Sequence, residues 1–385
     1  MKISVMIRAF ILFLVFYFIN EISFSQNAIE NYHKYLKSGD YINAKKEIDN
    51  AANDPLNSKV AEIWLCRGEI NSLLYLNKPT ENPGSIEIAY MSVMKASSLD
   101  VKKELSKDIA IQIKTISQLY FNKGATEFNN NKYTVALLSF ERSADVGNLI
   151  NPSVANPETY YYAGISAALA NNVDKEKKYL LQLSAQNYPK VDVYNYLAEA
   201  YKAEKNNTAA IEAYKKGISL FPNNSYILIV NVVKLFLNLG LTTEALEYLQ
   251  KGTTLNPTKD ELFYLLGSLY TTLKQDNDAM LSYKKAVEIN PNHGDASYNL
   301  GIILYNSSIN HLKTADSYLN SNQEKYSSEK EIFLTEIKKA TPLLEKALEL
   351  DGSNKNTMIC LLDIYKRLQR KEQYDKLKIK FNSTK

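Results

Sequence analysis

The chain of 385 residues has an ordinary composition, with 45% hydrophobic and 23% charged residues, and its 13 glycines and 10 prolines argue against long flexible or low-complexity regions. The formal net charge of +4 is close to neutral, and nothing in it indicates the concentrated basic patch of a nucleic-acid-binding protein. The 28 tyrosines are unusually many. Packed helices can use them, because the ring fills a groove while the hydroxyl reaches water.

The N-terminus predicts export. Two cations precede an uninterrupted apolar run of 11 residues at 9–19, and the small residues Ser23 and Ser25 follow it. Such a run is too short to span a membrane, which takes about 20 residues. We therefore expect residues 1–25 to be a cleavable signal peptide, and Gln26 to begin a mature chain without a stable membrane span. The expected location is the periplasm, or otherwise a secreted or envelope-associated site.

Four prolines mark an internal period in the middle of the chain. Pro189, Pro222, Pro257 and Pro291 are spaced by 33, 35 and 34 residues. A proline cannot continue a helix, so each one ends a unit and lets the next begin. Apolar residues between the prolines recur every three to four residues, which predicts amphipathic helices.

The clearest unit covers residues 260–293. Its two apolar halves are separated by a short polar turn at 274–277, which predicts a helical hairpin. Gly267 and Ala279 are small residues at positions where the two helices would approach each other.

This unit resembles a tetratricopeptide repeat (TPR), in which W-x2-L-G-x2-Y is followed by A-x3-F and a closing proline. The matching residues are Phe263, Leu266, Gly267, Tyr270, Ala279, Tyr283 and Pro291. The resemblance implies an all-α protein, a superhelical solenoid of helical hairpins.

The same pattern organises the chain before this unit. Residues 26–116 hold degenerate N-terminal repeats with a turn-rich insertion at 77–85, and residues 117–293 hold a regular array. One repeat of the array departs from the pattern, because Glu176 stands where alanine is expected.

The C-terminal part predicts a split repeat. Residues 294–354 open and close as one repeat, but about 27 extra residues within 306–339 lengthen both helices. Residues 355–385 are expected to form a capping helix, whose basic stretch 366–380 could contact anionic lipid or glycan or be a solvated face. The phrases at 295–306 and 340–351 resemble an exported TPR family of Bacteroidetes-type bacteria, which implies an envelope protein-binding scaffold without assigned catalytic residues.

Motifs that carry chemistry are missing from the sequence. His33, His293 and His311 do not stand at metal-ligand spacing, and we expect the last two to be surface residues. No phosphate-binding loop or nucleophile elbow occurs. Cys66 and Cys360 are too far apart to meet in a solenoid. We therefore expect no catalytic residue, cofactor or metal.

A groove is the remaining candidate for a site. The resemblance implies that the first helix of each hairpin lines a concave surface, where Phe121, Glu199 and Lys202 are also expected. The candidate partner-binding residues are Tyr161, Asn195, Asn231, Lys234, Tyr264, Tyr298 and Tyr305. Tyrosine can supply contact area and asparagine can bond to a peptide backbone. Equally, these tyrosines could pack on each other or under the 306–339 hairpin.

The leading hypothesis is therefore a non-enzymatic exported scaffold that binds a protein or an extended peptide on its concave face. The alternatives are a glycan-handling accessory protein of the cell envelope, in which the aromatic row stacks on sugars, and an enzyme without a recognised motif. The known TPR clamp for a terminal carboxylate is not indicated, since Glu199 and Glu261 fall where cations would be needed.

Overall fold

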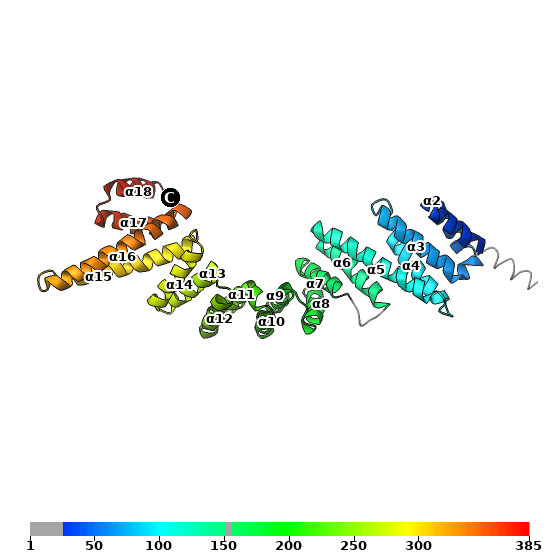
Figure 1. The fold of residues 1–385 in the computed structure, drawn as a ribbon, viewed down its shortest axis with the longest axis horizontal. Coiled ribbons are helices and arrows are strands. Elements are labelled where there is room, and N and C mark those ends of the chain that lie inside the picture. Colours follow the sequence, from blue (N-terminus) through cyan, green and yellow to red (C-terminus); the bar gives the residue numbers. More distant parts are fainter. Residues whose placement is uncertain (1–25, 151–155, 385) are drawn as a thin grey trace, which may run out of the picture. The chain divides into compact units, whose positions relative to one another are not determined.

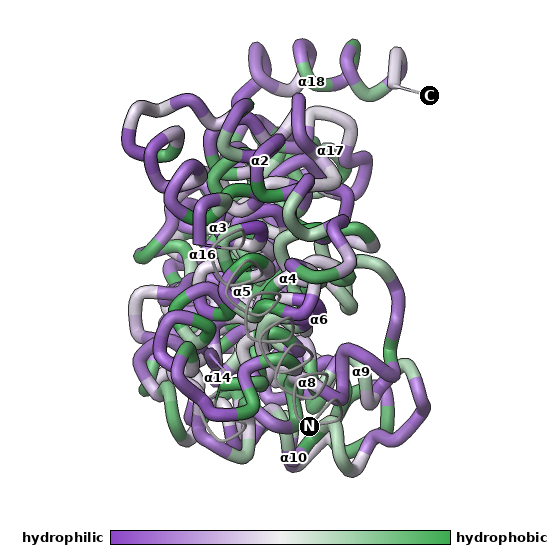
Figure 2. Tube along the Cα trace, turned by 90° about the vertical axis from the view of Figure 1, so that its right-hand side faces the viewer, coloured by the Kyte–Doolittle hydropathy of each residue, from purple (hydrophilic) through white to green (hydrophobic). Residues whose placement is uncertain are grey.

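The computed structural model describes residues 26–150 and 156–384, so the predicted signal peptide lies outside the described residues. Within these two ranges the protein is all-α, with two short 3-10 turns and no strand (Figure 1). Hydrophilic and hydrophobic stretches alternate along individual helices, as amphipathic packing requires (Figure 2). The chain forms a TPR solenoid of antiparallel helical hairpins, as the sequence predicted.

The helices fall into two compact units, the first ending at Glu204 and the second beginning at Lys205. The first unit contains a helix described over residues 26–37, α2 (Tyr41–Asn53), η1 (Asn57–Lys59), α3 (Ala61–Asn77), α4 (Ser85–Leu99), α5 (Ser106–Asn129), α6 (Tyr133–Asn148), α7 (Pro157–Leu169), α8 (Val173–Ala185) and α9 (Val191–Ala203). The second contains α10 (Asn207–Leu220), η2 (Pro222–Asn224), α11 (Tyr226–Asn238), α12 (Thr242–Leu255), α13 (Asp260–Thr272), α14 (Asp276–Ile289), α15 (Gly294–Tyr318), α16 (Gln323–Leu350), α17 (Lys355–Arg367) and α18 (Lys371–Ser383).

A residue in the left-handed backbone conformation forms the turn between the two helices of each regular hairpin. A residue with positive φ stands two positions before the second helix of each, and these residues are Gly39, Asn131, Asn171, Lys205, Gly240, Lys274 and Gln369. Glycine and asparagine adopt this left-handed conformation readily, and it stops the first helix. The two hairpins with insertions, α3–α4 and α15–α16, have no such residue in their connections.

A glycine on the first helix lets the two helices of a hairpin touch. A Cβ atom at Gly267 would lie 2.8 Å from the ring of Tyr283, so no larger residue fits without movement. We call this contact between a glycine of the first helix and a side chain of the second helix the seam. Its two residues are 16 positions apart in the sequence. Equivalent seam contacts join Gly124 to Phe140 and Gly164 to Leu180.

The sequence separation between the two seam residues shows how long the two insertions are. Gly68 meets Val93 and Gly301 meets Leu344 in the same way, at sequence separations of 25 and 43 residues. Relative to the regular 16, these hairpins carry 9 and 27 extra residues. The extra residues extend α15 and α16 into a long hairpin that projects past α13 and α14 (Figure 1).

One expected element is wrong. The C-terminal segment is a helical hairpin rather than one capping helix, because α17 ends at Arg367 and the positive φ of 56° at Gln369 turns the chain into α18. The first helix of the regular array, α5, begins at Ser106, ahead of the expected repeat boundary at 117. No helix in the described ranges is both long and apolar enough to cross a membrane.

Candidate functional site

Several first helices of neighbouring hairpins lie beside one another. In the first unit α3 contacts α5, α5 contacts α7 and α7 contacts α9, and in the second unit α15 contacts α17. Side chains at equivalent positions on these helices therefore come close together. The position three residues before the seam residue is aromatic in four hairpins, and its occupants are Phe121, Tyr161, Tyr264 and Tyr298.

Tyr161 is the best-formed groove residue of the first unit. Its hydroxyl donates a hydrogen bond of 3.2 Å to Asp192 Oδ2, and Lys190 Nζ lies 3.8 Å from the centre of its ring. Burial, followed by the charge of Asp192, raises the pKa of Tyr161 well above its usual value. The result is a neutral, half-buried ring with a fixed orientation. Asn195, which follows Asp192 by about one turn of α9, is also half-buried.

Phe121 faces neighbouring helices. Its ring lies 5.4 Å from that of Phe140 on α6 and 5.8 Å from that of Tyr162 on α7. Tyr162 also stacks on Phe140 at 5.5 Å. Phe121 is therefore part of an aromatic cluster that joins three helices.

In the second unit, Tyr264 lies over a histidine. Its ring is 4.7 Å from that of His293 and 6.0 Å from that of Tyr283. His293 was expected at the surface, but its side chain is only 11% exposed, so that expectation is wrong. The reason is local: its Nδ1 atom accepts a hydrogen bond from the Ala296 amide and caps α15.

Tyr298 and Tyr305 pack against the C-terminal helices. Both belong to a cluster formed with α16, α17 and α18, and the Tyr305 hydroxyl donates a hydrogen bond of 2.8 Å to Asp363 Oδ2 on α17. Burial and this bond raise the pKa of Tyr305. The structure thus brings Tyr298 and Tyr305 together in one cluster, while Tyr264 belongs to the neighbouring one.

The two remaining candidates lie on α11. Asn231 is half-buried and Lys234 is exposed. Among the described residues, no group of three or more His, Cys, Asp or Glu side chains could hold a metal ion, and both cysteines are free thiols.

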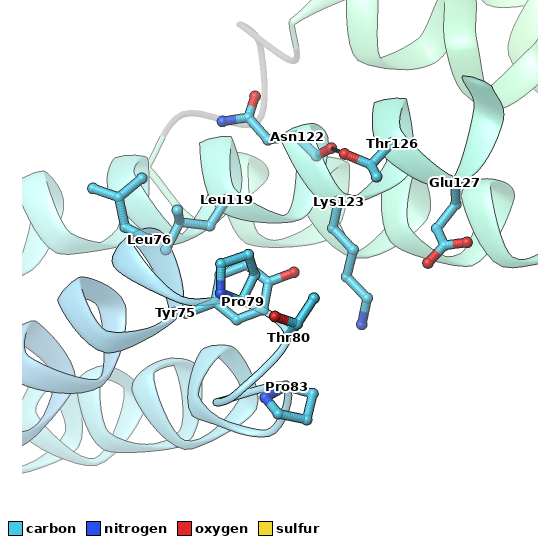
Figure 3. A pocket seen from close by; sticks show the side chains of 10 residues that line it. All are labelled: Tyr75, Leu76, Pro79, Thr80, Pro83, Leu119, Asn122, Lys123, Thr126 and Glu127. Carbon is cyan, nitrogen blue, oxygen red and sulfur yellow. Dashed lines mark hydrogen bonds between the residues drawn. The ribbon is translucent and has the colours of Figure 1, made fainter. Parts of the chain in front are cut away.

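Sequence reasoning missed a cavity of about 440 Å³ between α3, the inserted loop and α5 (Figure 3). Its lining consists of Tyr75, Leu76, Pro79, Thr80, Pro83, Leu119, Asn122, Lys123, Thr126 and Glu127. A signal for it existed in the sequence. Lys123 and Glu127 occupy the positions that Leu266 and Tyr270 fill in the clearest repeat, counted from the seam glycine.

A buried carboxyl group marks the other departure from the repeat pattern. Glu176 is only 5% exposed at the position where alanine was expected. Burial, together with the negative charge of Glu199, raises the pKa of Glu176 to about 7. The first unit therefore carries a group that titrates near neutral pH.

Comparisons with known proteins agree with the repeat assignment. Residues 191–224 match a model described as tetratricopeptide repeat, and residues 267–308 match one described as TPR repeat. The TPR repeat-containing protein YpiA of Bacillus subtilis is 25% identical over 224 residues, which cover 56% of this chain and 52% of that protein. Human tetratricopeptide repeat protein 17 is 25% identical over 190 residues, covering 44% of this chain and 17% of that protein.

Among solved structures, the C-terminal part of a TPR repeat-containing protein from Cytophaga hutchinsonii is similar. It has 18% sequence identity and a TM-score of 0.47, and the match covers 69% of this chain and 95% of that one. The chain spans about half the length of the Bacillus relative and about a sixth of the human one. The chain therefore contains tetratricopeptide repeats, recognised at residues 191–224 and 267–308.

Proposed function

We propose that the protein is an exported, non-enzymatic scaffold that binds a protein or an extended peptide along the surface of its first helices. The observation that carries this proposal is the recurrence of an aromatic side chain three residues before the seam. In Tyr161 and Tyr264 that side chain is half-buried and held in place by charged or aromatic neighbours. Rigid, partly exposed aromatic rings are typical anchors in protein interfaces.

Capture of a partner tests the proposal. The purified chain is immobilised and exposed to an envelope extract of the native host without added glycan, and bound proteins are identified by mass spectrometry. A groove variant carries Tyr161→Ala, Lys234→Glu and Tyr264→Ala. Tyr298 and Tyr305 stay in place because they also pack against α17.

The matched control changes exposed apolar residues on second helices, namely Met91→Ala, Leu181→Ala and Leu281→Ala. We expect the groove variant to lose the partner and the control to retain it, with unchanged helix content in both. Retention by the groove variant would place binding elsewhere. Export is tested separately, by intact mass of the protein from the native host, which we expect to begin at Gln26.

A further inference from the structure

The cavity beside α5 exists because two features of one repeat depart from the regular pattern. Lys123 and Glu127 replace the leucine and tyrosine that fill this space in the clearest repeat. The inserted loop then covers the opening from the side of α3, with Pro79, Thr80 and Pro83 as its wall (Figure 3).

The floor of the cavity is apolar. Tyr75 and Leu119 are buried in the core between α3 and α5, and Leu76 is 58% exposed at the rim. A volume of about 440 Å³ is within the range of small-molecule and side-chain pockets. The floor therefore suits an aliphatic or aromatic side chain.

The charges around the cavity leave one cation in excess. Glu127 Oε2 lies 3.3 Å from Lys132 Nζ, and on the loop Lys78 Nζ lies 3.0 Å from Glu81 Oε2. Lys123 forms no ion pair or hydrogen bond with any residue that the structure describes. Its side chain extends from α5 toward Thr80 and Pro83 (Figure 3). A carboxylate at this point would complete the charge balance.

Lys123 also lines a second cavity, of about 410 Å³, between α5 and α6. This cavity is lined by the exposed apolar side chains of Val135 and Leu138, by Arg142, which pairs with Glu87, and by the carboxylates of Glu141 and Asp145. A chain that enters the first cavity can therefore continue past Lys123 into the second. This continuity favours an internal segment of a polypeptide over a chain end.

We propose that these two cavities form a second peptide-binding site, which takes an extended segment with an apolar side chain next to an aspartate or glutamate. The apolar side chain enters between the inserted loop and Leu119, and the carboxylate pairs with Lys123. The first cavity is separate from the groove, because it lies on the flank of α5 that faces α3, whereas Phe121 contacts α6 and α7.

A displayed library of random ten-residue peptides, panned against the purified full chain, provides the probe. The most enriched peptide is synthesised with an amidated C-terminus, and its affinity is measured by fluorescence anisotropy. The test variants are Lys123→Glu and Leu76→Asp. The matched controls are Lys114→Glu and Ile111→Asp, at exposed positions on α5 outside both cavities.

We expect enrichment of apolar residues next to acidic ones, at least tenfold weaker binding to each test variant, and less than a twofold change in each control. Replacing the acidic residue of the peptide by its amide should weaken binding by the same factor, with little further loss in Lys123→Glu. Enrichment without an acidic residue, or binding that both test variants retain, would overturn the proposal. Loss of binding on C-terminal amidation would also overturn it, and loss only in the groove variant would assign the peptide to the groove.

Discussion

The two insertions lengthen their hairpins in opposite ways. The 27 extra residues of α15–α16 are mostly helical and extend a core shared with α17 and α18, in which Phe333 and Ile337 are buried. Within the insertion, His311 Nδ1 lies 2.6 Å from Glu329 Oε2. Part of the nine-residue insertion of α3–α4 lengthens α3 to 17 residues. The rest makes the connection 78–84 a loop without a single buried residue, held by turns such as the 3.0 Å bond from the Asn82 amide to the Lys78 carbonyl.

The difference teaches which kind of insertion creates a site. An added helical turn brings its own backbone hydrogen bonds and a side-chain face, so it extends the core. A loop pairs few of its own groups and covers the neighbouring helix loosely, which leaves the cavity against α5. Four substitutions can break or sharpen this comparison.

The largest effect is expected for Phe333→Ala in the helical insertion. Phe333 is buried among residues of α16, α17 and α18, and removing a buried aromatic ring typically costs about 3–5 kcal/mol of unfolding free energy. This loss of unfolding free energy is measured by chemical denaturation, with helix content as the signal. Leu334→Ala, at an exposed neighbouring position, should cost less than about 1 kcal/mol. Equal effects would mean that the insertion is not part of the core.

The second largest effect is expected for Gly267→Leu, at the glycine seam that recurs in the hairpins of Gly68, Gly124, Gly164 and Gly301. The new side chain would meet the Tyr283 ring, and overpacking typically costs about 1–3 kcal/mol. Because repeat stabilities add locally, the loss could separate the melting curve into two transitions. Gly84→Leu in the inserted loop is the control, since a Cβ there meets no atom within 4 Å. A curve like that of the unchanged protein would show that the seam tolerates bulk.

Features that recur at a fixed spacing, such as the seam, could be predicted from the sequence. Gly267 and its partners recur at a fixed spacing, so hairpins, repeat boundaries and the 27-residue insertion follow from local patterns. The cavity does not, because the conformation of residues 78–84 depends on contacts with α5 that no periodicity encodes. Tyr298 and Tyr305 show the same limit: their position on α15 was predictable, but their cover by α17 depends on how the C-terminal hairpin folds back.

The effect of Glu176→Gln on stability should grow as pH rises from about 4.5 to 7. The pKa of Glu176 is about 7 in the folded chain and lower when unfolded, so the folded chain binds the proton more tightly and its stability falls as pH rises from about 4.5 to 7. Glutamine removes the buried charge and should stabilise the protein by about 1–2 kcal/mol at pH 8 and very little at pH 4. Thermal melts at pH 4 and pH 8 test this difference in stability, with Glu247→Gln at an exposed position as the control.

The smallest effect is expected for Pro79→Ala in the inserted loop. This proline is exposed, so its removal loosens the unfolded chain more than it removes native contacts, at a cost of about 0.5–1 kcal/mol. The cavity wall should nevertheless become mobile. We therefore expect a small shift in the denaturation midpoint together with faster hydrogen exchange of backbone amides at 78–84, while exchange within α15–α16 stays unchanged. A stability loss as large as that of Phe333→Ala would show that the loop, like the helical insertion, is part of the core, and the distinction between the two insertions would fail.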